Sequence, residues 1–163
     1  MMRDIEFHPV QSADDLDLLD QALRALSVEL GDVHLADKAV LRAGLFGPVP
    51  AAYGLLALCE GALMGAALFS PVFSTARGAA GVYVSDLWIA EAARGQKLGA
   101  GVLAEVAKRA DLLWGSKWMT LAVYAHSTAS RRFYTRLGFE PQSNATTMRL
   151  SQDAMQRLIR NAQ

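Results

Sequence analysis

The segment ARGQKLGAG, Ala93 to Gly101, places two cations among glycines where a strand-like run gives way to a helix. The preceding run, GVYVSDLWI, has the β-branched and aromatic residues typical of a strand. A strand that leads directly into a helix presents the first free N–H groups and the positive dipole end of that helix. Glycines let an anion approach this backbone, and Arg94 and Lys97 suit a diphosphate better than a carboxylate. The turn is therefore a candidate phosphate site.

The alternative interpretation of this turn is that Gly95 and Gly99 serve only bending and packing, and that both cations are solvated. Other phosphate motifs fit less well, because the chain contains neither GxxxxGK[ST] nor GxGxxG. Nucleotide hydrolysis and dinucleotide binding are therefore disfavoured.

Other residues with chemical potential are scattered along the chain. Glu29 and Asp32, at the end of the first expected helix, are candidate amine-binding acids, although acids at helix ends are more often solvated. His126 is a candidate base because its reference pKa lies near 6.5, with a capping or loop histidine as the alternative. His8 and His34 have no second ligand at metal spacing, so no metal site is expected. The single Cys59 lies in the apolar run LLALCEG and is interpreted as a buried thiol of a reducing compartment.

Composition limits the class of protein. The chain has 163 residues, 52% of them hydrophobic and 20% charged, which suits one ordinary domain over residues 1–163. Lys plus Arg equals Asp plus Glu at 16 each, so charge gives no general attraction to nucleic acid or to an anionic membrane. The N-terminus has no signal-peptide core, and a cytoplasmic location is expected. The apolar stretch Ala51 to Phe73 is divided by Glu60-Gly61 into two strand-length halves, which predicts a buried hairpin and no membrane span.

The elements that must position these residues alternate between strands and helices. A strand is expected at the N-terminus, and Ser12 then caps a helix whose leucines recur at spacings of three and four. The leucines of this predicted core face are Leu16, Leu19, Leu23, Leu26 and Leu30. In the middle of the chain, the patterns predict a helix that begins at Asp37 and stops before GPVP, then the hairpin, then a loop FSTARGAAG. They next predict a strand VYVSDLWI, a helix from Gly99 to Asp111 and a strand WMTLAVY. The last expected elements are a serine-capped helix STASRRFYTRLGF stopped at Gly138, a strand through TTMRL and a helix SQDAMQRLIRNA.

Two segments carry a family resemblance. VSDLWIAEAARGQKLGAGVL resembles the acetyl-CoA-binding segment of GCN5-related N-acetyltransferases, and Arg94 and Gly99 match its signature. HSTASRRFYTRLGFE resembles the closing helix of the same family, through Phe133, Tyr134 and the Leu-Gly-Phe that follows. Finer features, LFGPVP, FST, DLWI and TTMRL, resemble the branch that includes diamine and polyamine acetyltransferases.

The resemblance implies a mixed α+β fold, with a mostly antiparallel twisted sheet of six to seven strands, helices on both faces, and a splayed strand pair at the acetyl-CoA site. Lys97 stands where the family usually has its first glycine, and we expect residue 97 to need no positive φ, because lysine is disfavoured there. The residues that the resemblance implies for the cofactor are Leu87, Trp88, Ile89, Arg94, Gly95, Gln96, Lys97, Leu98, Gly99, Ala100, Ser127, Ser130 and Phe133.

The resemblance also implies a division of chemical roles. Backbone N–H groups on the strand at 87–89 would stabilise the developing oxyanion, and Tyr134 would donate a proton to the sulfur of coenzyme A. The alternative for Tyr134 is a core aromatic. Asp86 matches an acid of the family branch and would take the proton of the amine, directly or through water, with His126 as an alternative base. Ser85 replaces a second acid, and Ser127 replaces an asparagine that often contacts the pantetheine arm.

These roles predict an acetyl-CoA-dependent N-acetyltransferase that acts on a small primary amine by direct attack in a ternary complex. Glu29, Asp32, Ser85 and His126 are the expected substrate-binding residues. The rivals are an acetyltransferase for protein N-termini or lysines and a non-catalytic acyl-CoA-binding module. A homodimer is a further expectation, since family members often pair.

Overall fold

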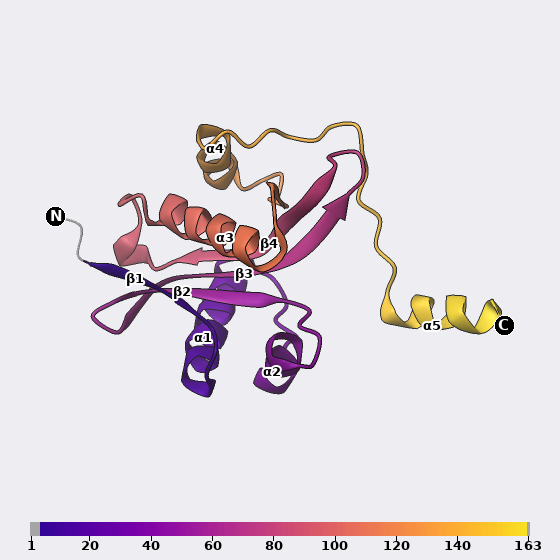
Figure 1. Ribbon diagram of the computed structural model, residues 1–163, viewed down its shortest axis with the longest axis horizontal. Coiled ribbons are helices and arrows are strands. Elements are labelled where there is room, and N and C mark those ends of the chain that lie inside the picture. The colour runs from indigo at the N-terminus through magenta and orange to yellow at the C-terminus, as the bar shows by residue number, and fades with distance from the viewer. Residues whose placement is uncertain (1–3, 163) are drawn as a thin grey trace. The chain divides into compact units, whose positions relative to one another are not determined.

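The computed structural model describes residues 4–162 of the chain, which forms two compact units, residues 1–124 and residues 125–163 (Figure 1). The first unit contains the sheet, and the second contains two helices. Among the described residues no helix is both long and apolar enough to cross a membrane.

The sheet of the first unit has five strands in the order β1-β2-β3-β4-β5. All neighbouring pairs are antiparallel except β4 and β5, which are parallel. This confirms the mixed α+β class and the mostly antiparallel sheet, with five strands in the described residues where six or seven were expected. The strands are β1 (Ile5–Pro9), β2 (Tyr53–Cys59), β3 (Ala62–Ser74), β4 (Ala79–Ile89) and β5 (Trp118–Leu121).

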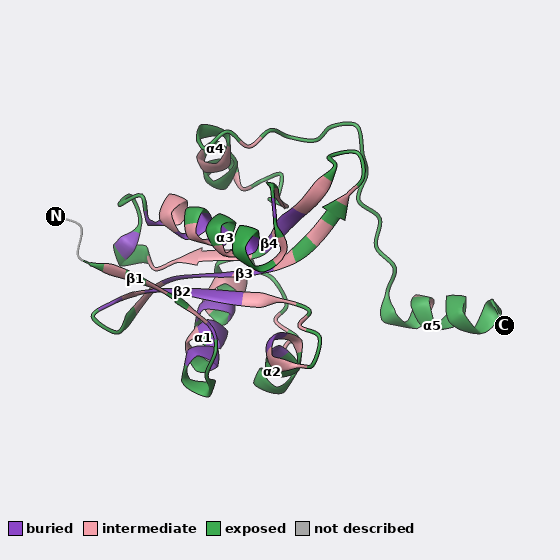
Figure 2. Cartoon of the chain, in the orientation of Figure 1, coloured by how far each residue is buried: buried purple, intermediate pink, exposed green. Residues whose placement is uncertain are grey.

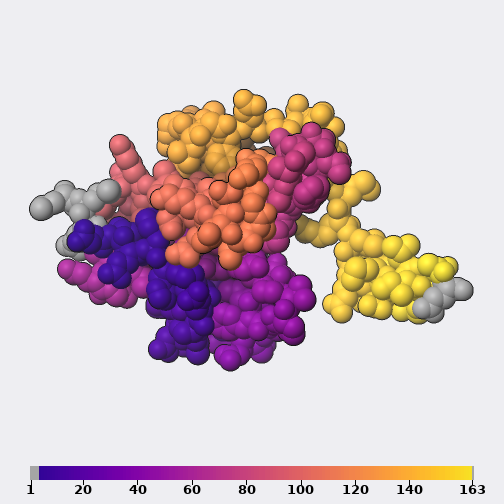
Figure 3. Space-filling model, in the orientation of Figure 1, coloured from indigo at the N-terminus to yellow at the C-terminus, as the bar shows by residue number. Residues whose placement is uncertain are grey.

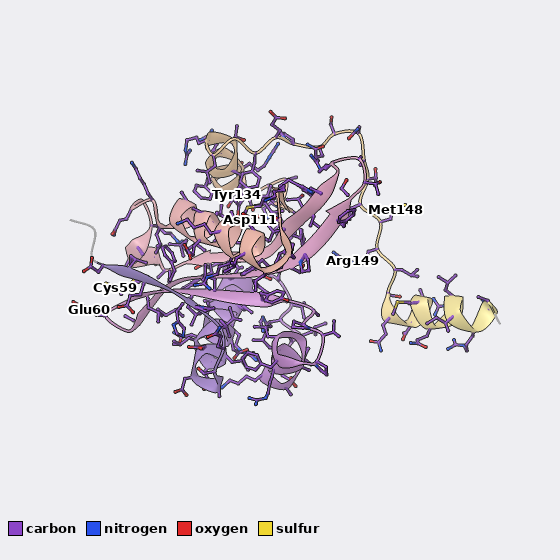
Figure 4. The ribbon with its side chains drawn as sticks, in the orientation of Figure 1. Cys59, Glu60, Asp111, Tyr134, Met148 and Arg149 are labelled. Carbon is purple, nitrogen blue, oxygen red and sulfur yellow. The ribbon has the colours of Figure 1, made fainter. Side chains whose placement is uncertain are left out.

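The predicted hairpin is confirmed, and a second, longer one follows it. β2 pairs with β3 around Glu60-Gly61, and both turn residues have positive φ (50° and 79°). Cys59 and Glu60 are labelled at this turn in Figure 4. β3 continues to Ser74 and β4 begins at Ala79, so the predicted loop FSTARGAAG shrinks to residues 75–78. The small residues of this segment pair across the hairpin, which composition alone does not reveal.

Helices cover both faces of the sheet, α1 and α2 on one and α3 on the other (Figure 1). Figure 3 shows α1 in indigo and α2 in purple packed beside each other, and the buried residues in Figure 2 gather where these helices and α3 meet the strands. The helical elements of this unit are α1 (Ala13–Leu30), α2 (Lys38–Phe46), a 3-10 turn η1 (Glu91–Ala93) and α3 (Leu98–Trp114).

The leucine stripe of α1 supplies much of the core between the helices and the sheet. Leu16, Leu19 and Leu23 are buried there with Leu56 and Ala66 of the sheet. Leu30, at the end of the predicted core face, is instead 36% exposed. The last turn of α1, which carries the predicted substrate acid Glu29, therefore extends past the core.

The second unit contains α4 (Thr128–Arg136) and α5 (Gln152–Asn161). Gly138 follows α4 with φ of 97°, as expected of a helix stop. The predicted strand through TTMRL is wrong: residues 146–150 pair with no strand in the described part of the chain, and Met148 is 90% exposed. A strand needs hydrogen-bonding partners as well as a suitable composition. The apolar residues of α5, Met155, Leu158 and Ile159, are also exposed.

Candidate functional site

The second half of β4 has a free edge, and a β-bulge marks where it begins. β4 pairs with β5 only from Gly81 to Val84, whereas its pairing with β3 continues to Ile89. Asp86 lies opposite Leu68 and Val84 opposite Phe69, so Ser85 is the extra residue of the bulge. Alternate backbone groups of residues 85–89 therefore point away from β3 without a strand to pair with. This is the splayed strand pair expected from the resemblance.

The turn after β4 has left-handed backbone at two positions. Gly95 has φ of 78°, and a Cβ built on it would meet no atom within 4 Å. Lys97 has φ of 64° and ψ of 12°, so the expectation that residue 97 needs no positive φ is wrong. The backbone keeps the conformation that suits a glycine, although a lysine occupies the position. This conformation costs an L-residue about 1–2 kcal/mol.

The N-terminus of α3 is left uncapped by this turn. Helix α3 begins at Leu98, and no described side chain makes a cap hydrogen bond at Lys97. The first N–H groups of a helix have no partner within the helix, and left-handed residues turn neighbouring N–H groups into a concave anion site. The turn therefore fits a diphosphate such as that of coenzyme A.

Arg94 is held by the protein itself. One terminal nitrogen donates to both oxygens of Glu29, at 2.7 and 2.8 Å, and Nε donates to the carbonyl of Ile89 at 3.0 Å. The same Glu29 accepts from the indole of Trp88 at 3.3 Å. A predicted substrate acid and a predicted phosphate cation are thus partners, and together they join the end of α1 to the end of β4. Lys97, which is exposed, forms no ion pair with another described residue.

Asp86 stands on the face of β4 that packs under α1. Its cross-strand partner Leu68 and the nearby Trp88 both pack against the core beneath α1. Burial raises the pKa of Asp86 above its ordinary value, and the charge of Asp32 adds to this increase. The hydrogen bond from Ser85 and the electrostatic effect of His34 both lower this pKa, but by less than burial raises it. A carboxyl with a raised pKa is a better proton acceptor than an ordinary one.

Two further groups surround this acid that the sequence did not single out. His34, considered only as a metal ligand, has its Nδ1 2.9 Å from the hydroxyl of Ser27. Tyr124, just after β5, donates its hydroxyl to Asp32 at 2.6 Å. No spacing in the sequence connects Tyr124 with Asp32, because 92 residues separate them. Only the sheet brings them together.

The remaining predicted residues belong to the second unit. Tyr134, labelled in Figure 4, lies on α4 with its ring 5.1 Å from that of Phe133 and 5.5 Å from that of Phe139. Burial raises the pKa of Tyr134, which keeps its phenol protonated. Ser127 is the N-cap of α4 but makes no side-chain cap bond, and Ser130 and His126 are exposed. Within residues 4–162 no three His, Cys, Asp or Glu side chains gather to hold a metal.

Comparison with known proteins adds a family model and several folds. The model described as the acetyltransferase (GNAT) family matches residues 20–139. No curated protein sequence matches this chain. An integron cassette protein from the mobile metagenome of V. cholerae is 18% identical, with a TM-score of 0.73 over 95% of this chain and 97% of the other.

Two named enzymes share the same fold. A ribosomal-protein-alanine N-acetyltransferase from Brucella melitensis biovar Abortus 2308 is 16% identical, with a TM-score of 0.72 over 90% of this chain and 100% of the other. The aminoglycoside N-acetyltransferase AAC(6′)-Iy, solved in complex with CoA, is 14% identical, with a TM-score of 0.74 over 92% and 97% of the two chains. At these identities the likeness shows the fold.

Proposed function

Because this chain belongs to the acetyltransferase (GNAT) family, we propose that it transfers an acetyl group from acetyl-CoA to a primary amine of a small molecule. Acetyl-CoA is the acyl donor of the family and supplies the activated thioester. The observation that carries the proposal is the pairing of an uncapped, left-handed turn with a half-buried acid beside the free edge of the same strand.

The turn and its helix would hold the diphosphate of the donor. The N–H groups at the start of α3 and the ammonium of Lys97 are the phosphate-binding groups of this proposal. Arg94 acts mainly by holding the turn, since Glu29 and Ile89 already engage it. Along the free edge at residues 87–89, the N–H groups of Leu87 and Ile89 are available to the acetyl oxygen, whereas that of Trp88 faces β3.

Asp86 is the proposed acceptor of the proton that the amine must lose. A free amine attacks a carbonyl and an ammonium does not, so the site needs a group that takes this proton. The pKa of Asp86 is raised, and a general base works best when its pKa lies near the working pH. Asp32, held by Tyr124, lies in the same cluster and is the proposed contact for the cationic form of the arriving amine. His34 adds a third titratable group beside Asp86.

Tyr134 is the proposed proton donor to the departing sulfur. Its phenol is protonated at neutral pH, because burial raises its pKa. The family model runs from residue 20 to residue 139 and so includes α4. This supports the proposal that both units belong to a single acetyltransferase domain.

The test is an acceptor panel of diamines, monoamines, amino acids and peptides, with release of the coenzyme A thiol as the readout. We expect small amines to release thiol, and kcat/KM to rise with pH through the raised pKa of Asp86, because only its carboxylate form accepts a proton. Asp86→Asn should lower kcat/KM by about 10²–10⁴-fold with little change in coenzyme A affinity. Asp37→Asn, which removes an exposed carboxyl at the start of α2, is the matched control.

The outcomes separate the candidates. Activity restricted to peptides would identify a protein acetyltransferase. Tight binding of coenzyme A without thiol release from any acceptor would identify a binding module. Wild-type kinetics of Asp86→Asn would remove Asp86 from the mechanism and leave the activity itself standing.

A further inference from the structure

A cavity of about 350 Å³ lies in the first unit, apart from the residues considered so far. Its walls come from the end of β1, the start of β2, the end of α2 and the last turns of α3. Most of the lining is apolar, including Leu45, Phe46 and Leu113. The volume falls within the range of about 300–1,000 Å³ found for small-molecule sites.

The base of this cavity is aromatic and well anchored. Tyr53 and Phe69, which line it, stack with their ring centres 6.0 Å apart, and the ring of Trp114 lies 5.3 and 6.2 Å from them. The indole of Trp114 donates to the carbonyl of Gly81 at 3.0 Å, and Phe69 is only 1% exposed. The floor is therefore preformed, and Tyr53, which unlike Phe69 is partly exposed, offers flat apolar contact.

One cation enters this apolar lining. Nε of Arg109 is buried and has no hydrogen-bond partner among residues 4–162. Glu105 forms an ion pair with this nitrogen at 3.6 Å, beyond hydrogen-bond distance, and a second ion pair with Lys108 at 3.5 Å. Because Nε is closed to solvent while the side chain of Arg109 is 27% exposed, a ligand carboxylate can reach the guanidinium only through its terminal nitrogens, with which it would form a charge-assisted hydrogen bond.

The cavity is separate from the proposed acetyl-transfer site. Arg109 comes eleven residues after Leu98, where α3 begins, which corresponds to about 16 Å along the helix axis. None of the residues predicted for the cofactor or the amine lines the cavity.

We propose that this cavity binds a small anionic amphiphile, a carboxylate attached to an alkyl or aromatic body. The carboxylate accepts from a terminal nitrogen of Arg109, and the apolar body lies against the ring of Tyr53. The exposed side chains of Leu112 and Leu113 at the rim would also suit an apolar side chain from a second copy of the protein. A purely apolar occupant would bury the guanidinium and leave its N–H unpaired, which favours the anionic ligand.

The experiment is calorimetric titration of the full chain with octanoate and with 1-octanol, which has an equally long chain and no charge. We expect octanoate to bind at least about tenfold more tightly than octanol, because a charge-assisted hydrogen bond is worth at least that much. Arg109→Gln should reduce octanoate binding to the level of octanol, and Glu105→Gln should tighten it by removing the competing carboxylate. Lys108→Gln, which removes the same charge from an exposed position of α3, should change octanoate binding little.

Three results would overturn the proposal: no octanoate binding, equal binding of octanoate and octanol, or unchanged octanoate binding by both Arg109→Gln and Glu105→Gln. A dimer in sedimentation that excludes octanoate would assign the cavity to a second copy instead. The Glu105→Gln arm keeps the test decisive even if Arg109→Gln fails to fold. The titration contains no coenzyme A, so its failure would leave the proposed acetyl transfer untouched.

Discussion

The N-termini of α1 and α3 differ in whether side chains of the protein accept hydrogen bonds from their free backbone N–H groups. At α1, the hydroxyl of Ser12 accepts from the N–H of Asp15 at 3.1 Å, and the carboxylate of Asp15 accepts from the N–H groups of Ser12 and Gln11 at 2.9 Å. His8 adds a contact of 3.0 Å to the same carboxylate. At α3, Lys97 occupies the N-cap in a left-handed conformation and no described side chain caps the helix.

This difference separates a helix start that serves stability from one that we propose serves binding. The donors of α1 are satisfied within the protein, so an added anion has little to gain there. The donors of α3 keep their capacity for a ligand, and the protein accepts a strained lysine at that position. The contrast predicts that changes at Lys97 alter affinity, whereas changes at Asp15 alter folding.

The largest expected effect is that of Lys97→Glu. This change removes a cation and places a carboxylate at the uncapped end of α3, where it competes with the diphosphate. Loss of a contact worth about 1.5–3 kcal/mol should raise the Kd for coenzyme A by about 10–150-fold, measured by calorimetry. Lys108→Glu makes the same charge change at an exposed site on the same helix and should leave the Kd nearly unchanged. Equal Kd values for Lys97→Glu and the wild type would rule out the phosphate site.

Asp15→Ala should lower the stability of the protein and leave its affinity for coenzyme A unchanged. Its removal leaves the N–H groups of Gln11 and Ser12 without their acceptor, and the free energy of unfolding should fall by about 1–3 kcal/mol in urea titrations. Asp14→Ala changes an exposed acid of the same helical turn and is the control. A loss of coenzyme A affinity in folded Asp15→Ala would contradict the separation of the two roles.

A smaller effect is expected of Lys97→Gly. Glycine adopts positive φ freely, and after allowing for its greater freedom in the unfolded chain the gain in stability should be about 0.5–1 kcal/mol. Coenzyme A should bind more weakly, because one cation is lost while the backbone turn remains. Lys108→Gly, in the helix interior, should instead destabilise by about 1 kcal/mol. Destabilisation of both variants would show that the left-handed lysine is not strained.

The smallest expected effect is a pH dependence of opposite sign for two acids. Burial tends to raise the pKa of Asp15, but the hydrogen bonds from Gln11 and Ser12 outweigh it, so the pKa is lowered from 3.8. Its stabilisation is present above pH 3.8 and is lost as pH falls through the lowered pKa. The pKa of Asp86 is raised by burial, so the folded state holds its proton longer and stability declines as pH rises from 3.8 through the raised value.

Urea titrations across this acidic range check both signs. Asp86→Asn should be more stable relative to the wild type above the raised pKa, and Asp15→Ala should lose its defect at the lowest pH values. Parallel stability curves for Asp86→Asn and the wild type would contradict the burial of the Asp86 charge.

Local patterns accounted for much of the fold. The leucines of α1, the Ser12 and Asp37 caps and the Glu60-Gly61 turn each depend on neighbours a few residues away, so their elements were predicted correctly. Errors arose where pairing with a distant strand decides the outcome, as at residues 73–74, 79–81 and 146–150. The conformation of Lys97 was missed because its side chain disfavours a geometry that the surrounding turn imposes.

Residue types and spacing were sufficient to recognise a member of the acetyltransferase (GNAT) family and to predict a glycine-containing turn directly before α3, because both signals lie within short segments. The partnership of Arg94 with Glu29, the environment that raises the pKa of Asp86 and the aromatic cavity at Arg109 became visible only in three dimensions. Each of them joins residues from separate helices and strands, and the distances and desolvation that govern charge and binding exist only after the chain has packed.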